Sequence, residues 1–525
     1  MGKVNLLDCT LRDGGYVNDW MFGEDTIKGF CQKIGQTGIE FFEVGFLKGD
    51  SYNSDKAVFP TVESYIPMIT PKYPGLKYVG MVDMSNPVSL DVIPRYDGNS
   101  IDGIRVIFKK DKIEEAYDYC KKIKKLGYFL SVNFVSTDAY TDEEFIHGIN
   151  KFNDILPDAM AIVDTFGLIK RKQFLRMVYI ADNNMADDIT LAYHAHNNLQ
   201  QAMGNAEALV ELNLKRDVMI DACIFGMGRG AGNLNLELFA EFMNENYDSD
   251  YKIEPMLEIM DEYLADIYRD KFWGYSLPLY LSASMKCHPN YAIYLAEKDS
   301  LTAKNFQEIL SEIDPDDKAK FSKDKAEYYY SNYMAKGFDD AETKKAIHNK
   351  LEGRNIVILA PGRTLIDYEG QIKDTIKKQN AVVIAVNFLP TSIDADYIFS
   401  NNIKRYRKIK GRINVPCILT SNVEDDNDVA YRLDYKKYVS SNPDVMDNSG
   451  LMLLRFLISI GIKEISFAGF DGYSDYYGKD YYSRDLEYSF SSKAENRNKY
   501  ISDELNSLGK EIKINYITPT KYCNI

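Results

Sequence analysis

The sequence has little of what marks a secreted or membrane-bound protein. Its seven cysteines are an odd number and none stands in a CxxC spacing, so we expect reduced thiols and no disulfide framework. No apolar run reaches the ~18 residues that a membrane-spanning helix needs. Residues 1–20 show no basic segment followed by an apolar one, as a signal peptide would. We therefore expect a cytoplasmic protein with no membrane partner.

Positive charge is also scarce. The chain has 63 Lys and Arg against 78 Asp and Glu, a net charge of -15 and a pI near 5.0. Proteins that bind nucleic acid need basic surfaces to neutralise phosphates, so we expect no nucleic-acid partner. A small anionic substrate is not excluded, because a local arginine or a bound metal can make the electrostatic potential at one site positive.

The first 230 residues alternate apolar runs with helical patterns. The runs are short and nearly continuous in apolar character, which is typical of parallel strands buried on both faces. Helical patterns such as 24–38 and 112–127 end at glycine, as helices commonly do. Eight alternations predict a (β/α)8 TIM barrel at residues 1–250, with its site at the carboxyl ends of the strands. The runs are 4–11, 39–46, 76–83, 103–109, 128–136, 159–166, 189–196 and 218–225.

The remaining chain predicts two further parts, as expected for a length of 525 residues. Residues 251–350 are helical in composition and are interpreted as a helical cap and linker. Residues 351–525 show a second α/β pattern with five apolar runs, four of which end in polar or glycine-rich loops. This pattern predicts a Rossmann-like, doubly wound α/β domain. Overall the fold class is α/β.

Two of only five histidines, His194 and His196, stand in YHAHNN on the seventh predicted strand. Strand side chains alternate, so both point to the same face at the mouth of the barrel. Asp13, placed at the end of the first strand, lies across that mouth. Two imidazoles and a carboxylate with open positions suit a divalent metal. Asn233, in the glycine-rich stretch 226–237, is either a fourth ligand or the cap of the next helix.

Other polar residues have competing interpretations. One histidine at a strand end is usually structural, but two of them with a carboxylate favour a metal site. Glu43, placed at the end of strand two, either faces the mouth or pairs with Arg12. Asp164, at the end of strand six, either supports the site or is structural. The glycine-rich stretch either approaches a ligand or is only a tight turn.

The motifs DCTLRDGG, FEVGF, VDTFG, HAHNN and GMGRGAGN, in this order, resemble the metal-dependent aldolase and lyase superfamily of (β/α)8 enzymes. That group includes 4-hydroxy-2-oxovalerate aldolases, which the chain resembles most, hydroxymethylglutaryl-CoA lyase and isopropylmalate synthase. The resemblance covers about residues 1–290. It implies that Asp13, His194 and His196 bind Mn²⁺ or Mg²⁺, with Asn233 added as in the lyases. It also implies that Arg12 holds a 2-oxo acid and stabilises its enolate.

Two departures from the superfamily pattern bear on the chemistry. Tyr16 stands where hydroxyoxovalerate aldolases have a histidine, and a phenol with an ordinary pKa near ~10 is a poor base, so Tyr16 either donates a proton or leaves the base to another group. The loop GMGRGAGN lacks the cysteine of the lyase branch, which disfavours a thioester lyase. Tyr275 aligns loosely with a helical tyrosine near the aldolase site. The resemblance thus implies an aldolase that joins or splits pyruvate, or a close 2-oxo acid, and an aldehyde.

The predicted second domain resembles the Rossmann-type bacterial sialyltransferases and pterin-pyrophosphokinase-like domains over about residues 355–475. This implies a nucleotide site that includes Gly362, Asn387 and Asn401, at the ends of predicted strands. No histidine follows His348, so sialyl transfer itself is not expected. The alternative is a structural domain in which these asparagines are turn residues.

Together the two domains predict an aldolase whose aldehyde is a sugar or a nucleotide-linked sugar, as in the synthesis of surface-polysaccharide precursors. The expected partners are these small molecules, and we expect a homo-oligomer. Three alternatives stay open: a glycosyltransferase or nucleotide-sugar-binding protein with an inactive barrel, an acyl-CoA-dependent lyase or synthase, and an Fe(II) oxygenase with the same facial ligands.

Overall fold

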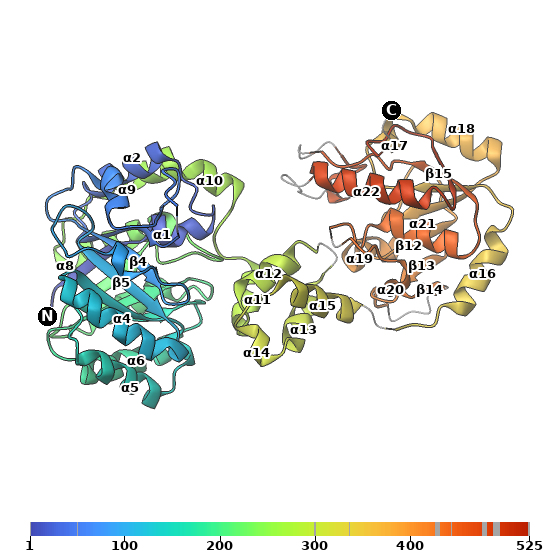
Figure 1. The fold of residues 1–525 in the computed structure, drawn as a ribbon. Coiled ribbons are helices and arrows are strands. Elements are labelled where there is room, and N and C mark those ends of the chain that lie inside the picture. Colours follow the sequence, from blue (N-terminus) through green and yellow to red (C-terminus); the bar gives the residue numbers. More distant parts are fainter. Residues whose placement is uncertain are drawn as a thin grey trace. The chain divides into compact units, whose positions relative to one another are not determined.

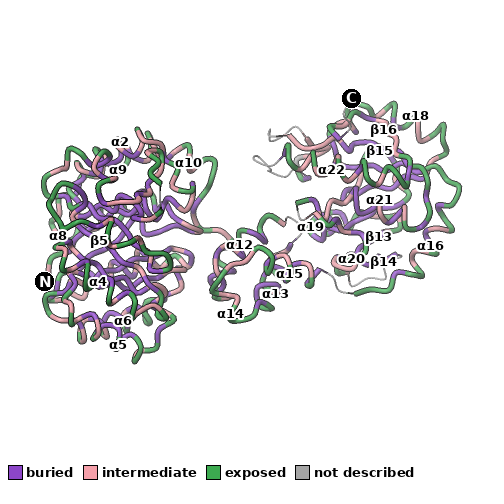
Figure 2. Tube along the Cα trace, viewed as in Figure 1, coloured by how far each residue is buried: buried purple, intermediate pink, exposed green. Residues whose placement is uncertain are grey.

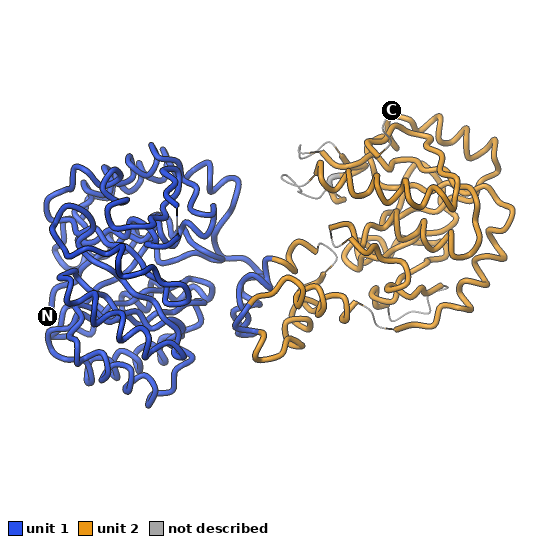
Figure 3. Tube along the Cα trace, in the orientation of Figure 1, with its two compact units in different colours: residues 1–293, 318–320 blue, residues 294–317, 321–525 orange. Residues whose placement is uncertain are grey.

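The chain forms two compact units (Figure 3), Met1–Ile293 with Lys318–Lys320 and Tyr294–Asp317 with Phe321–Ile525. The computed structural model describes residues 2–49, 51–298, 301–334, 337–425, 431–442, 444–474, 480–486 and 494–522. Within these residues no helix is both long and apolar enough to cross a membrane.

The first unit is a closed barrel of eight parallel strands (Figure 1). The barrel closes because β1 pairs with β9 on one side, Val4 opposite Val218, and with β2 on the other, Leu7 opposite Phe41. Each predicted apolar run overlaps one strand, which confirms the predicted barrel. The strands are β1 (Val4–Asp8), β2 (Phe41–Leu47), β4 (Lys77–Asp83), β5 (Gly103–Phe108), β6 (Phe129–Phe134), β7 (Ala159–Asp164), β8 (Thr190–Ala195) and β9 (Val218–Ala222).

Helices surround these strands, and the strands themselves are buried (Figure 2). Helix α4 ends at Leu126, where Gly127 takes a left-handed conformation, φ 93°, as the glycine in the sequence predicts. A two-residue strand, β3 (Val58–Phe59), pairs in parallel with the end of β2. The helices are α2 (Glu24–Ile34), α3 (Ile66–Ile69), α4 (Ile113–Leu126), α5 (Asp142–Asn153), α6 (Arg171–Asn184), α7 (Ala202–Glu211) and α8 (Leu236–Tyr247).

The helices that follow the barrel are divided between the two units. They are α9 (Glu254–Ile259), a π-helical turn (Met260–Leu264), α10 (Ala265–Asp270), α11 (Leu277–Ser284), α12 (Pro289–Ala296), α13 (Ala303–Glu312), α14 (Pro315–Lys318), α15 (Lys323–Met334) and α16 (Ala341–Leu351).

The second unit contains a parallel sheet of seven strands in the order β14-β13-β12-β11-β10-β15-β16. The chain runs outward from β10 to β14 and then returns to the other side of β10, so the order reverses between β10 and β15. This is the doubly wound arrangement that the sequence predicts. The strands are β10 (Ile356–Leu359), β11 (Val382–Val386), β12 (Tyr397–Ser400), β13 (Cys417–Thr420), β14 (Tyr431–Leu433), β15 (Glu464–Ala468) and β16 (Lys513–Tyr516).

The sequence missed the edge strands β14 and β16. β14 has three residues, and β16 has exposed or half-buried side chains throughout, so neither shows a continuous apolar run. The helices of this unit are α17 (Thr364–Asp367), α18 (Glu369–Gln379), α19 (Ile403–Ile409), α20 (Tyr435–Tyr438), α21 (Ser449–Ser459) and α22 (Ala494–Leu508).

Candidate active site

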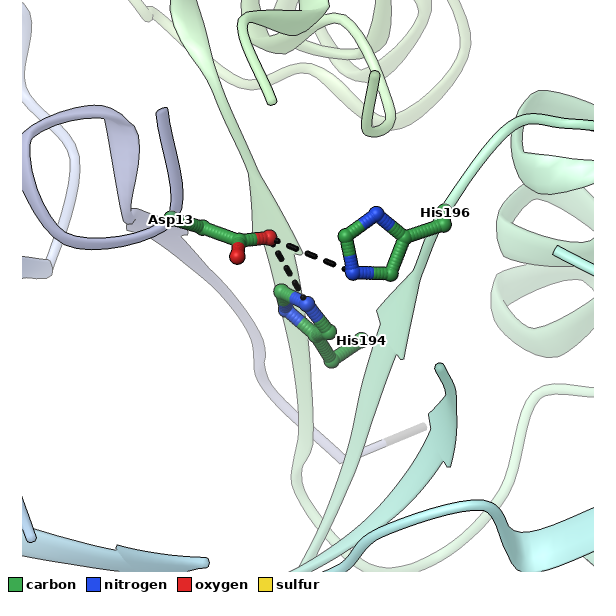
Figure 4. A group of neighbouring side chains, drawn as sticks. All are labelled: Asp13, His194 and His196. Carbon is green, nitrogen blue, oxygen red and sulfur yellow. Dashed lines mark ion pairs between the residues drawn. The ribbon is translucent and has the colours of Figure 1, made fainter. Parts of the chain in front are cut away.

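Three buried side chains meet at the mouth of the barrel: Asp13, His194 and His196 (Figure 4). One ligand atom from each lies within 4.8 Å of the others. Asp13 Oδ2 is 3.2 Å from His194 Nε2 and 3.5 Å from His196 Nε2. The structure therefore brings together the three residues that the sequence singled out as metal ligands.

The two histidines and the aspartate reach this point from different elements. His194 lies on β8, and His196 follows the end of that strand and forms an isolated bridge with Asn233. Asp13 does not end the first strand, as the sequence suggested, but lies on a helical turn, α1 (Thr10–Asp13). The strand stops at Asp8 because its carboxylate accepts hydrogen bonds from the backbone N–H and the hydroxyl of Thr10, which turns the chain.

The donor set fits a divalent metal. Asp13 Oδ2 and Asn233 Oδ1 are buried and have no hydrogen-bond partner among the described residues. The Asn233 amide nitrogen donates to Cys223 Sγ and to the Met227 carbonyl, which leaves its oxygen as the open acceptor. Asn233 does not cap α8, whose N-cap residue is Asn235. Burial lowers the pKa of His196 to about 4, so its imidazole is neutral and has a lone pair for a metal.

Arg12 is buried beside these residues and is held by two carboxylates. Its Nε donates to Glu43 Oε2 at 2.6 Å, and its Nη1 lies 3.0 Å from Asp13 Oδ1. Glu43 lies within β2, as the third residue of the strand, and not at its end. Burial alone would raise the pKa of Asp13, but the neighbouring positive charge, that of Arg12 first, brings it well below its ordinary value, so the carboxylate stays ionised.

Two further charged residues, Arg105 and Asp221, complete a ring of buried ion pairs. Arg105 Nη1 lies 3.2 Å from Glu43 Oε1, and Arg105 also pairs with Asp221. Asp221 Oδ2 lies 3.1 Å from His194 Nδ1, which closes the ring back to Asp13. Neither residue is among the site residues predicted from the sequence. Their signal is a charge inside an apolar strand, in GIRVIF and VMIDA, where a charge needs a partner.

Tyr16 lies near the cluster and Tyr275 does not join it. Burial, and then the charge of Asp13, raises the pKa of Tyr16, so its hydroxyl stays protonated and is suited to donate a proton. Tyr275 is 54 % exposed, and its described ring contact is with Tyr280 at 6.4 Å. The loose alignment that selected Tyr275 rested on a position after the barrel, where the strand pattern no longer fixes the spacing.

Asp164 and the glycine-rich stretch both shape loops. The Asp164 carboxylate accepts hydrogen bonds from the backbone N–H groups of Leu168 and Ile169, which is the structural interpretation. Gly232 has φ 79°, and a Cβ there would lie 2.0 Å from the Gly226 carbonyl oxygen. A tight turn therefore requires this glycine, and it places Asn233 beside His196.

In the second unit, Gly362, Asn387 and Asn401 line one cavity of about 140 Å³. It lies at the carboxyl ends of β10 and β15, the neighbouring strands between which the strand order reverses. The Asn387 amide donates to Asn401 Oδ1 at 2.8 Å, and the Ser400 hydroxyl donates to Asn387 Oδ1 at 2.6 Å. A Cβ at Gly362 would lie 2.3 Å from the Gly469 carbonyl oxygen, so glycine allows the two loops to approach.

Comparisons with known proteins find similar sequences for the barrel unit. Residues 104–261 match the HMGL-like family model. A 4-hydroxy-2-oxovalerate aldolase from Desulfitobacterium hafniense is 24% identical over 272 residues, which is 51% of this chain and 79% of that protein. An oxaloacetate decarboxylase from Mycobacterium tuberculosis is 22% identical over 243 residues, 44% of this chain and 67% of that protein.

Among solved structures, the N-terminal domain of a candidate aldolase from Bacteroides vulgatus superposes with a TM-score of 0.50 and 23% identity. The match covers 56% of this chain and 96% of that domain, and it supports the fold of the barrel unit. Residues 104–261 of the barrel are thus similar to the HMGL-like family, and proteins named 4-hydroxy-2-oxovalerate aldolase and oxaloacetate decarboxylase are among the similar proteins, as the motifs suggested.

Proposed function

We propose that the barrel is a divalent-metal-dependent aldolase that joins or splits pyruvate, or a close 2-oxo acid, and an aldehyde. The observation that carries this proposal is the buried group of Asp13, His194 and His196 beside the Arg12 guanidinium. Such a cation next to a metal site suits the enolate oxygen of a 2-oxo acid. Relatives named 4-hydroxy-2-oxovalerate aldolase support the reaction type.

Asp13, His194, His196 and the Asn233 amide oxygen would hold Mn²⁺ or Mg²⁺, which when bound supplies Lewis acidity to the 2-oxo acid. Glu43 and Asp13 fix the orientation of Arg12, so its remaining N–H groups are free to donate to the developing oxyanion. Tyr16, protonated at neutral pH, donates its proton to the aldehyde oxygen as the new carbon–carbon bond forms.

The first test is proton–deuterium exchange at the pyruvate methyl, followed by NMR in D₂O. We expect exchange with Mn²⁺ or Mg²⁺ that chelator abolishes, and that is lost in Asp13→Asn and in His194→Ala. Circular dichroism of both variants controls for folding. Exchange that survives both substitutions would refute the metal assignment.

We propose further that the aldehyde is a sugar or nucleotide-linked sugar and that the cavity of the second unit binds the nucleotide. Its support is the position of the cavity outside the carboxyl ends of β10 and β15, where open α/β sheets commonly bind ligands. Isothermal titration of the full chain with CMP, UDP and UDP-N-acetylglucosamine tests this. We expect one of the three compounds to bind, and Asn387→Ala to lower the affinity for it. If none of the three gives a heat of binding, the proposal of a nucleotide site is wrong.

A further inference from the structure

Two cations at the mouth of the barrel lack an acidic partner. Within the described part of the chain, neither Arg229 nor Lys48 has a carboxylate within 4.0 Å. Arg229 belongs to the loop after β9, and Lys48 directly follows β2, so both lie at the carboxyl ends of strands. Both side chains are half-buried. The other two arginines near the mouth, Arg12 and Arg105, are each paired with two carboxylates.

Aromatic rings lie against both cations. The Arg229 guanidinium carbon is 4.1 Å from the centre of the Tyr16 ring. Lys48 Nζ is 3.9 Å from the Trp20 ring and 4.2 Å from the Phe46 ring. The three rings touch one another, with centroids 4.8 Å apart for Tyr16 and Trp20 and 5.5 Å apart for Trp20 and Phe46. We call these five residues the cation–aromatic patch.

The patch is built onto the loop that carries the metal-binding aspartate. Trp20 Nε1 donates to the Arg12 carbonyl at 2.7 Å, next to Asp13. A Cβ at Gly15 would lie 2.1 Å from the Trp20 ring, so only glycine lets the indole pack on this loop. Packing within residues 12–20 therefore fixes where Trp20, which belongs to the patch, lies relative to Asp13.

The charges around the patch offset its positive charge only in part. Asp19 pairs with Lys56, and Asp83, which accepts a hydrogen bond from the Ser85 backbone, offsets part of the Lys48 charge from beyond ion-pair distance. Arg229 Nη1 has His288 Nε2 at 3.5 Å, and that imidazole is neutral because burial and Arg229 lower its pKa to about 4. Rings attract cations through their faces but carry no net charge. Arg229 and Lys48 are thus half-buried cations with no carboxylate at ion-pair distance among the described residues, and an anionic ligand in contact with them would complete the balance of charge.

We propose that Arg229 and Lys48 bind the anionic group, phosphate or carboxylate, of the acceptor aldehyde. This rests on the proposed aldolase function and narrows its substrate class to aldehydes that carry a negative charge. The 2-oxo acid has its own site, since the cluster around Asp13 and the guanidinium of Arg12 serve its carboxylate and keto oxygens. The patch begins where that site ends, at Tyr16, which places the anion of the acceptor beyond the aldehyde that Tyr16 protonates.

The test measures binding without turnover, so that it does not depend on the aldolase reaction. Isothermal titration of the full-length protein in EDTA compares glycerol 3-phosphate, glycerate and glycerol, which share one carbon skeleton. We expect an anion to bind and glycerol not to bind. Arg229→Gln and Lys48→Met should each weaken that binding by tenfold or more. Anion binding that is absent in the wild type, or that both variants retain at the wild-type affinity, overturns the proposal.

A matched control is Lys121→Met. Lys121 is an exposed lysine on α4 whose Nζ lies 5.5 Å from the Tyr117 ring, so it repeats the cation–ring contact away from the mouth. Lys121→Met should leave anion binding unchanged. If this variant also binds the anion more weakly, the loss of affinity in Arg229→Gln and Lys48→Met reflects the net charge of the protein. Thermal melts of all variants report their folding.

A second titration tests whether Arg229 and Lys48 bind the anion of the acceptor or the carboxylate of the 2-oxo acid. In the presence of Mg²⁺ and saturating pyruvate, glycerol 3-phosphate or glycerate should still bind, because the acceptor site is separate. If pyruvate displaces it, Arg229 and Lys48 serve the 2-oxo acid and the acceptor assignment is wrong. Absence of pyruvate methyl exchange in the wild type, with anion binding intact, would contradict the aldolase reaction and leave the anion site standing.

Discussion

His194 Nδ1 lies 3.1 Å from Asp221 Oδ2, while its other ring nitrogen faces Asp13. A proton on Nδ1 that is donated to a carboxylate leaves the lone pair of Nε2 for a metal, which is the usual role of such a carboxylate. Asp221 is in turn held by Arg105, which reaches it from β5. Asp221 and Arg105, which are not candidate ligands, therefore favour Nε2 as the His194 nitrogen that faces the metal site.

Asp221→Asn tests this relationship. We expect Mn²⁺ affinity, measured by isothermal titration, to fall by roughly 10- to 100-fold, since loss of such a partner weakens both the orientation and the basicity of the imidazole. Asp182→Asn is a matched control, because Asp182 pairs with Arg216 in the same unit, away from the cluster. Equal Mn²⁺ affinity of Asp221→Asn and the wild type would show that Asp221 is only structural.

Arg12→Lys keeps the charge but loses the planar group that pairs with Glu43 and Asp13 at once. Loss of a single oxyanion donor typically costs ~100- to 1000-fold in rate. We expect metal-dependent exchange at the pyruvate methyl to fall by about that factor. Mn²⁺ titration of the same variant shows whether the cluster is still formed. Exchange at the wild-type rate would exclude Arg12 from the chemistry.

Tyr16→Phe removes the proposed proton donor and keeps the ring under Arg229. Proton donation belongs to the aldol step and not to enolate formation. We therefore expect aldol addition to slow by about 100-fold, within the range for general acid catalysis, and by much more than methyl exchange. Both rates come from one NMR experiment with pyruvate and an aldehyde. An equal loss in both would place Tyr16 in enolate formation instead.

Asp8 makes the stability of the barrel depend on pH. Burial raises the pKa of Asp8 to about 7, although its hydrogen bonds with Thr10 oppose this. The folded state therefore holds a proton that the unfolded state releases above about pH 4, and stability falls as the pH rises from about 4 to about 7. Asp8→Asn keeps the turn but does not titrate. The free energy of unfolding of the variant, minus that of the wild type, should therefore be larger at pH 8 than at pH 4.5.

The difference should reach a few kcal/mol, at about 1.4 kcal/mol per unit of pKa shift. Urea unfolding followed by tryptophan fluorescence reports on the barrel alone, because both tryptophans, Trp20 and Trp273, lie in the first unit. If the free energy of unfolding of the variant changes between pH 4.5 and pH 8 as much as that of the wild type, Asp8 is not the source of the pH dependence.

The sequence by itself determined the strands of the barrel and the pair of histidines. The apolar runs are continuous because both faces of a parallel strand are buried, and His194 and His196 share a face because side chains alternate along a strand. These are local rules. The same rules failed at the edge strands β14 and β16, which are short or partly exposed, and at Asp13, where a side-chain hydrogen bond of Asp8 ends the strand early.

Only the tertiary structure decided which charges pair inside the barrel. Whether Glu43 would face the mouth or pair with Arg12 was open from the sequence, and the structure shows the pair. Arg105 and Asp221 meet because β5 and β9 stand on opposite sides of a closed barrel, at a separation of 116 residues along the chain. Closure brings their side chains into one small interior, and no local pattern encodes that distance.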